Sequence, residues 1–245
     1  MVSLNRLFAF VVLLLSPISL SGAEPMRRVV VYGGHVSLEV PVSWQEIPAE
    51  ALEFHSLRAA EASGGKTAEI YQHGFRPGDP ETDFSLPQIL IQIRESGRLA
   101  YGQFLHLPPL AELQSEGEQR LSERAGPMLN RVELDEVSFD RASFSLRVTN
   151  TLDLIVEGIA RVDTFSFLTE RGLFTIHCYA PASQTDVYAP LFADIIASVR
   201  LDEDIAYRPR LGDRWPPSPA TIAFAAAALG MAVLLVLALK RRVRA

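Results

Sequence analysis

The sequence predicts an α+β fold, an antiparallel sheet flanked by helices, with one C-terminal transmembrane helix added. Three observations lead to this prediction. Apolar and polar residues alternate with a period of two along several short runs, which is typical of strands with one buried face. Very short turns separate successive runs, which favours antiparallel neighbours. An uncharged, almost wholly apolar stretch fills residues 219–239 near the end of the 245-residue chain.

The stretch 219–239 has the length of a membrane span. About 20 apolar residues with a rise of about 1.5 Å each match a hydrocarbon core of roughly 30 Å. The tail that follows, residues 240–245, contains Lys240, Arg241, Arg242 and Arg244. A basic cluster at this place is typical of the cytoplasmic side. We therefore expect the lipid bilayer to hold the chain through this helix.

The first 23 residues have the layout of a secretory signal peptide. A thin basic region at Arg6 precedes the apolar run 7–15, and small residues at Ser21 and Ala23 favour cleavage before Glu24. An uncleaved membrane helix is the alternative, although the run is short for one. The expected localisation is the cell membrane, single-pass, with the N-terminal domain outside and the tail in the cytoplasm. A C-terminal sorting signal that is removed by a processing enzyme is an alternative explanation of the tail.

The region between these segments divides into a domain, residues 24–201, and a Pro-rich spacer, residues 202–218. All 29 acidic residues but only 18 of the 23 basic residues lie in 24–218, which leaves this region a net charge of −11. Such a charge argues against binding to nucleic acid and against lying flat on anionic lipid. The spacer is polar and shows no periodicity, so we expect it to hold the domain off the bilayer. Trp215 stands where an interfacial anchor is expected.

Strand patterns dominate the domain. In residues 36–44, Val and Leu alternate with Ser and Glu up to Trp44, and Pro41 places the strand at a sheet edge or ends it. Further strands are expected at 28–32, 67–75, 87–94, 130–139, 142–150, 153–168 and 172–180. The last four form an antiparallel meander because only short turns separate them.

Two helices complete the expected domain. Residues 110–125, after Pro108 and Pro109, form a highly charged helix with a narrow apolar stripe, which we place on the surface of the sheet. Residues 185–199 carry a broad apolar face. Because Pro190 is tolerated in a first helical turn but not deep inside a helix, we expect the regular helix to begin near Val187.

The single cysteine, Cys178, excludes an intrachain disulfide. It alternates with Phe174 and Ile176, so we expect a buried structural thiol rather than a nucleophile. His177 and Tyr179 lie on the opposite face of the same strand. They line a groove if that face is open, and an ordinary half-buried sheet position is the favoured alternative.

The chain resembles the PsbP/Mog1-like superfamily, including its bacterial envelope members. The resemblance covers residues 36–201. It rests on the Val40-Pro41-Val42-Ser43-Trp44 strand and on the run from Tyr188-Ala189-Pro190 through Ile195-Ile196 to Ser198, and it departs at Ser43, where many members carry glycine, and in the polar insert 76–86. The resemblance implies a binding or assembly module with no shared catalytic motif, so no functional residue is carried over.

No catalytic motif, metal-binding motif or phosphate-binding loop occurs in the sequence. Asp79, Glu81 and Asp83 are dense enough in carboxylates for Ca²⁺, but they lack the EF-hand spacing, so a solvated turn is favoured. We therefore predict no catalytic residue, no cofactor-binding residue and no metal ligand. The predicted function is a membrane-anchored extracytoplasmic binding or accessory module that docks a protein partner in the cell envelope. The alternative is a hydrolase-like enzyme whose site is assembled from His177, Tyr179, Asp79 or Glu81.

Overall fold

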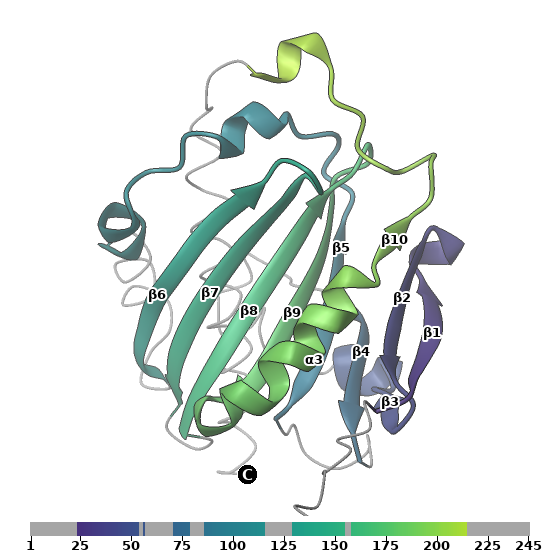
Figure 1. Ribbon diagram of the computed structural model, residues 1–245, viewed down its shortest axis with the longest axis vertical. Helices are drawn as coiled ribbons and strands as arrows, with labels where there is room; N and C mark the ends of the chain where they lie inside the picture. The colour runs from purple at the N-terminus through teal and green to yellow at the C-terminus, as the bar shows by residue number, and fades with distance from the viewer. Residues whose placement is uncertain are drawn as a thin grey trace, which may run out of the picture.

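The computed structural model describes residues 24–53, 56, 71–78, 86–115, 129–154 and 158–214. They form two antiparallel sheets (Figure 1). The smaller sheet has the strand order β1-β2-β10, with bounds β1 Met26–Val31, β2 Val36–Pro41 and β10 Arg200–Leu201. The larger sheet has seven strands in the order β3-β4-β5-β9-β8-β7-β6. Their bounds are β3 Trp44–Glu46, β4 Tyr71–Pro77, β5 Gln88–Arg94, β6 Leu129–Asp140, β7 Ser145–Leu154, β8 Gly158–Leu168 and β9 Leu173–Pro181.

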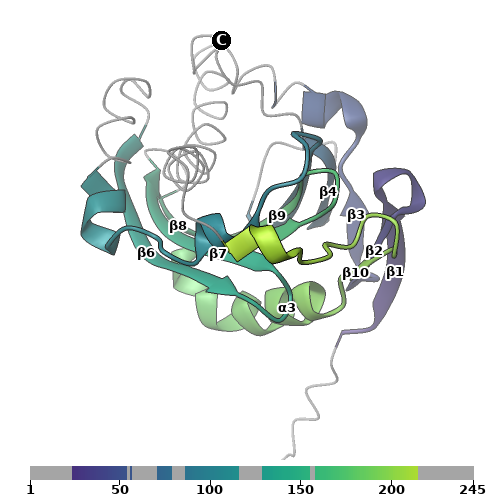
Figure 2. The same cartoon turned by 90° about the horizontal axis from the view of Figure 1, so that it is seen from above.

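One α-helix, α3 (Thr185–Ala197), lies across a face of the larger sheet, beside β10 and the small sheet (Figures 1 and 2). Short 3₁₀ turns occupy the connections: η1 Tyr32–Gly34, η2 Tyr101–Phe104, η4 Ala182–Gln184 and η5 Leu211–Arg214. The turn η5 lies at one end of the molecule, beyond the ends of the long strands (Figure 1).

Strand alternation divides the core between the two faces of the larger sheet. On β9, Phe174, Ile176 and Cys178 point into the cluster that α3 covers, while Leu173 and Tyr179 point into the cluster on the other face. All five are buried. The period-two pattern therefore assigns each residue of β9 to one of two separate cores, because successive side chains of a strand leave on opposite faces.

The predicted meander is confirmed. The strands β6, β7, β8 and β9 pair in sequence order, and every pairing is antiparallel. The strand expected over 36–44 is shorter, since β2 ends at Pro41 and the chain turns at Val42 and Ser43 before β3 joins the other sheet. The side chain of Val42 is 53% exposed for this reason, whereas the alternation placed it on the buried face.

The last helix begins at Thr185, two residues before the predicted start at Val187. Pro190 is the sixth residue of this helix, beyond the first turn, and has no N–H to donate to the carbonyl of Asp186. The expected apolar face is also narrower, because Phe192 and Ile195 are buried while Val187 is 67% exposed. One helix lying on a sheet buries only the side that faces the strands.

The structure corrects the prediction of a spacer detached from the domain. In the segment 202–214, Ile205, Tyr207 and Asp213 are buried against the domain. Thr169 forms a β-bridge with Ala206, and Glu170 donates its backbone N–H to the carbonyl of Ile205 at 2.9 Å. The segment lacks hydrophobic periodicity because single residues, rather than one face of an element, make its contacts. Residues 215–218 lie outside the described residues.

The signal peptide predicted over 1–23, the span over 219–239 and the tail over 240–245 also lie outside the described residues. Among the helices that are described, none has the length and apolar character needed to cross a membrane. Of the helix predicted over 110–125, residues 110–115 are described and are helical, with Leu113 buried.

Candidate functional site

The residues of the alternative enzyme site are only partly within the described chain. His177 and Tyr179 share one face of β9, as predicted, and their ring centroids lie 6.3 Å apart. Both are buried, so they do not line an open groove. Asp79, Glu81 and Asp83 lie outside the described residues.

Burial decides the chemistry of His177. Its Nδ1 lies 3.0 Å from the hydroxyl of Thr164 on β8, and the ring of Tyr71 stands edge-on at a centroid distance of 5.8 Å. Burial first, and then the charge of Arg94, lower the pKa of His177 to about 3. An acid–base group works best with a pKa near the operating pH, so His177 in this position is a neutral core residue rather than a proton carrier.

Cys178 is buried on the other face of β9, as its alternation with Phe174 and Ile176 predicts. Burial raises the pKa of the thiol well above its usual value, and the nearby carboxylate of Asp163 adds to the shift. The nucleophilic form of a cysteine is the thiolate, which this site disfavours.

A band of buried polar side chains lies beside His177 and was not predicted. Gln88 pairs in register with Tyr179, and Gln92 with Thr175, on the face of the sheet that carries His177. Both amide atoms of Gln88 and of Asn150, Oε1 of Gln92 and Nε2 of His177 are buried and make no hydrogen bond. The spacing of Gln88 and Gln92 in the apolar run 88–93 shows that they share a face, but it does not reveal how deeply that face is buried.

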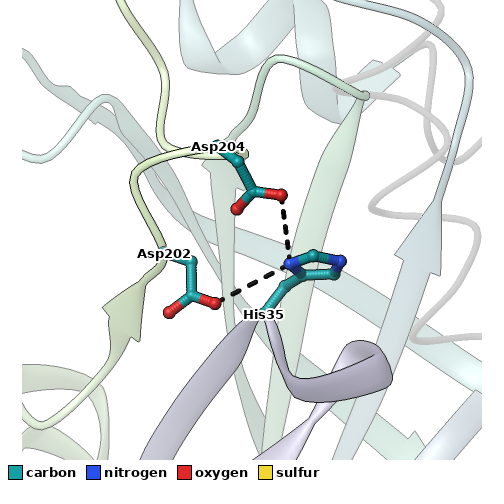
Figure 3. Close-up of side chains that lie close together, drawn as sticks. All are labelled: His35, Asp202 and Asp204. Atoms are coloured by element: carbon teal, nitrogen blue, oxygen red, sulfur yellow. Dashed lines mark ion pairs between the residues drawn. The ribbon is translucent and has the colours of Figure 1, made fainter.

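Three potential metal ligands meet at the start of the segment 202–214 (Figure 3). Nδ1 of His35 lies 3.2 Å from Oδ2 of Asp204 and 3.7 Å from Oδ2 of Asp202. Imidazole and carboxylate groups form a donor set for divalent cations. Here, however, the guanidinium of Arg171 pairs with Asp204 at 3.0 Å and lies 3.4 Å from Nε2 of His35. Because this charge already compensates Asp204, we interpret the group, called the His35 cluster below, as a surface ion-pair cluster.

The remaining described histidines are isolated from one another. His73 lies 3.0 Å from the carboxylate of Glu46 in an exposed cross-strand pair, and His106 is exposed. His55 lies outside the described residues.

Two grooves flank the C-terminal end of α3. The first, of 570 Å³, separates α3 from the small sheet. Its floor contains Met26 and Leu38, and its rim carries charges of both signs, from Arg28, Glu39, Asp194 and Arg200. The backbone N–H of Glu39 donates to the hydroxyl of Ser198 at 2.8 Å, which ties β2 to the end of the helix.

The second groove, of 440 Å³, lies between α3 and the strands β6, β7 and β8. Its floor is apolar and its rim is polar, with lining residues that include Phe165, Phe167, Ile196, Val199, Asp140 and Arg147. The guanidinium of Arg147 lies over the ring of Phe165 at 5.4 Å and pairs with Asp163 at 2.9 Å. At the rim, hydrogen bonds from the hydroxyl of Ser143 and the N–H of Ala142 lower the pKa of Asp140, so this carboxylate stays ionised in mild acid.

The last turn of α3 separates the grooves, which share Ala197 and Arg200 as lining residues. The guanidinium of Arg200 donates to the carbonyls of Ala197 and Val199 at 2.7 and 2.8 Å, and so caps the helix end. Neither groove is lined by a histidine or a cysteine among the described residues. An apolar floor with a charged rim is the anatomy of a binding surface. No pattern in the sequence placed β2, α3 and β7 side by side.

No protein-family model matches the sequence, and no curated protein is similar to it. Among solved structures, the chain is similar to the cyanobacterial PsbP (CyanoP) of Synechocystis, with 11% identity and a TM-score of 0.48 over 76% of this chain and 98% of the other. It is also similar to the Ran-binding protein Mog1p of Saccharomyces cerevisiae, with 13% identity and a TM-score of 0.40 over 73% and 96% of the two chains. A Pseudomonas aeruginosa protein of unknown function, PA94, described as a putative regulator, shares 9% identity with a TM-score of 0.31 over 76% and 97%.

The similar structures include a PsbP and a Mog1p, the two proteins after which the superfamily resembled by residues 36–201 is named. With TM-scores below 0.5, these similarities carry no argument about function, which must come from the residues of this chain.

Proposed function

We propose that the chain is a membrane-anchored extracytoplasmic binding module that docks a protein partner in the cell envelope, and that the two grooves beside α3 are its docking surface. The observation that carries the proposal is the meeting of two open grooves at one helix end, where apolar side chains lie among charged ones and no histidine or cysteine is among the described lining residues.

The form of the surface favours a protein partner. Protein interfaces combine an apolar centre with a polar rim in which arginine is enriched. Phe165, Phe167 and Ile196 supply the apolar centre, and Arg28, Arg147 and Arg200 belong to the rim. The grooves also lie on a rigid frame, since β9, β8 and α3 are tied together through one buried core.

The anchoring part of the proposal rests on the sequence. The apolar run 219–239 followed by four basic residues predicts the span and its orientation, and the signal-like residues 1–23 predict export. The enzyme alternative ranks second, because His177 is buried with a pKa of about 3.

Site-specific photo-crosslinking in cells tests the docking surface. A photoreactive amino acid replaces Asp194, an exposed residue of the first groove, or Ser138, a residue of the second, in the full chain. The matched control replaces Ile159, which is 54% exposed on β8 and lies six residues, about 20 Å, along the strand from Phe165.

We expect adducts of the same mass from positions 194 and 138 and no such adduct from position 159. Adducts that are equally strong at position 159, or no adduct from either groove, would reject the grooves as the docking surface. Resistance of the full chain to carbonate extraction tests the anchoring part separately.

A further inference from the structure

The turn η5 presents a fully exposed leucine that follows two exposed arginines. Leu211 has a relative exposure of 103%, the largest among the exposed large apolar residues of the described chain. Arg208 and Arg210 are exposed beside it. Val30, Val42, Ile159 and Val187 are also exposed, but they lie on β1, on the turn after β2, on β8 and on α3. Leu211 is the one that lies in the segment leading to the predicted span.

This turn is held firmly to the domain. Two residues after Leu211, the carboxylate of Asp213 is buried and accepts hydrogen bonds from Arg98, from the hydroxyl of Tyr207 at 2.9 Å and from the N–H of Arg210 at 2.6 Å. The hydroxyl of Tyr207 in turn accepts from the backbone N–H of Tyr101 at 3.0 Å. The backbone at Leu211 is therefore held in place, so burying the side chain of Leu211 elsewhere requires little further loss of backbone conformational entropy.

Chain length places η5 near the bilayer if residues 219–239 span it. Five residue steps lead from Arg214 to Pro219, which is at most about 18 Å of extended chain. The headgroup layer on each side of the hydrocarbon core is roughly 5–8 Å thick. The end of the domain that carries η5 is therefore within reach of the lipid headgroups, whereas a detached spacer from residue 202 would have allowed far greater separation.

Charge favours the same orientation. Residues 24–218 carry a net charge of −11, but the four residues 208–211 contain two arginines and no acidic residue. An anionic lipid surface repels most of the domain and attracts the arginines beside Leu211. An exposed apolar side chain next to arginines suits the boundary between headgroups and acyl chains.

We propose that η5 is a membrane-contacting tip, in which Leu211 enters the headgroup region of the bilayer and Arg208 faces lipid phosphates, while Arg210 stays paired with Glu170 at 2.7 Å. This inference rests on the anchoring part of the proposed function. It adds a fixed orientation of the domain, in which the end that carries η5 faces the bilayer and the domain does not reorient freely.

Fluorescence quenching in vesicles tests the tip. The full chain is reconstituted in phosphatidylcholine vesicles, with or without phosphatidylglycerol, that contain a doxyl-labelled quencher lipid. A polarity-sensitive thiol dye is placed at Leu211→Cys. The control at Val187→Cys reports an equally accessible position on α3, and Ala228→Cys reports insertion of the predicted span. The native Cys178 is buried and should stay unlabelled in the folded protein.

We expect a blue shift and loss of fluorescence at positions 211 and 228, with little change at position 187. We also expect Arg208→Gln to reduce the response at position 211 in vesicles with phosphatidylglycerol more than in vesicles without it. Quenching at position 228 with an unquenched, water-exposed dye at position 211 would overturn the tip and leave the anchor standing. An unquenched position 228 would overturn both. A blue shift at position 211 without lipid quenching would indicate a protein occupant and also reject the tip.

Discussion

Two polar clusters attach the segment 202–214 to the domain, and they differ in burial. The Arg98 cluster joins Arg98, Glu170, Tyr207 and Asp213, and the side chains of Arg98 and Asp213 are only 16% and 6% exposed. In the His35 cluster, which joins His35, Arg171, Asp202 and Asp204, side-chain exposure ranges from 29% to 60%. Adjacent residues of one turn, Glu170 and Arg171, contribute to the two clusters.

In the Arg98 cluster, hydrogen bonds from Arg98 hold the pKa of Asp213 well below its usual value, although burial alone would raise it. The guanidinium of Arg98 also lies 4.5 Å from the centroid of the Tyr207 ring. Exposed ion pairs contribute little, because water and salt screen them, whereas removing one partner of a buried pair leaves a costly charge behind. We therefore expect the Arg98 cluster to determine whether the segment stays docked.

The turn between β8 and β9 positions both clusters. A Cβ at Gly172 would lie 2.0 Å from the carbonyl oxygen of Arg94, so only glycine allows this close approach. The N–H of Gly97 donates to the carbonyl of Arg171 at 3.0 Å. These contacts hold Glu170 and Arg171 at fixed places beneath the segment.

The largest expected effect comes from Arg98→Leu. This change leaves the carboxylates of Glu170 and Asp213 without their shared partner, and we expect the free energy of unfolding to fall by about 3 kcal/mol. The matched control Arg171→Leu, in the His35 cluster, should cost less than about 1 kcal/mol. Denaturant titrations of the two variants measure the difference. Equal losses would show that burial does not distinguish the clusters.

A smaller effect is expected from Tyr207→Phe. The ring and its contact with Arg98 remain, but the hydroxyl that accepts from Tyr101 and donates to Asp213 is lost. We expect a loss of about 1–2 kcal/mol, because one buried donor and one buried acceptor lose a partner. Thermal unfolding compares it with Tyr188→Phe, a half-buried tyrosine of α3. If both variants match the wild type, the hydroxyl of Tyr207 is not a link in the cluster.

Acid should also weaken the Arg98 cluster. We expect the resulting loss in the free energy of unfolding to be comparable to that of Tyr207→Phe or smaller. The pKa of Asp213 is lower in the folded protein than its usual value of 3.8, so its contribution to stability is present above pH 3.8 and is lost as the pH falls toward the folded pKa. We expect about 1 kcal/mol by pH 2.5, after allowing for solvent screening.

The comparison of wild type with Asp213→Asn isolates this carboxylate. His177, whose low pKa also costs stability below pH 6.5, is present in both proteins and cancels. The difference in unfolding free energy between the two proteins should shrink as the pH falls below 3.8. A difference that stays constant from pH 7 to pH 2.5 would contradict the assignment.

The smallest expected effect is that of Asp204→Asn. The exposed pairs with His35 and Arg171 should contribute less than about 1 kcal/mol, and less still in high salt, where the Debye length is about 3 Å. Chemical denaturation with urea at low and high ionic strength measures this. A salt-independent loss of several kcal/mol would mean that the His35 cluster holds the segment after all.

Local pattern predicted most of the elements of the domain. Alternation located β2, β5, β7, β8 and β9, and it placed Cys178 and His177 on opposite faces of one strand, because the period of a strand is fixed by its backbone. The predicted ends of the strand before Trp44 and the predicted apolar face of the last helix differ from those observed. Val42 continued an apolar pattern but is exposed, because the alternation does not reveal the turn after Pro41. Val187 is exposed because the pattern does not reveal that only one side of α3 contacts the sheet.

The sequence by itself determined the charge of the chain, its predicted anchor, and the strands and helix of its domain, since each depends on residues close together along the chain. Tertiary structure alone decided that Arg98 meets Asp213 across 115 positions, that His177 is sealed from water, and that two grooves meet at Arg200. Such contacts arise from sheet register and from the path of the chain over the sheet. No local periodicity encodes them, which is why residues 202–218 were expected to be a semi-rigid spacer, whereas residues 202–214 pack against the domain.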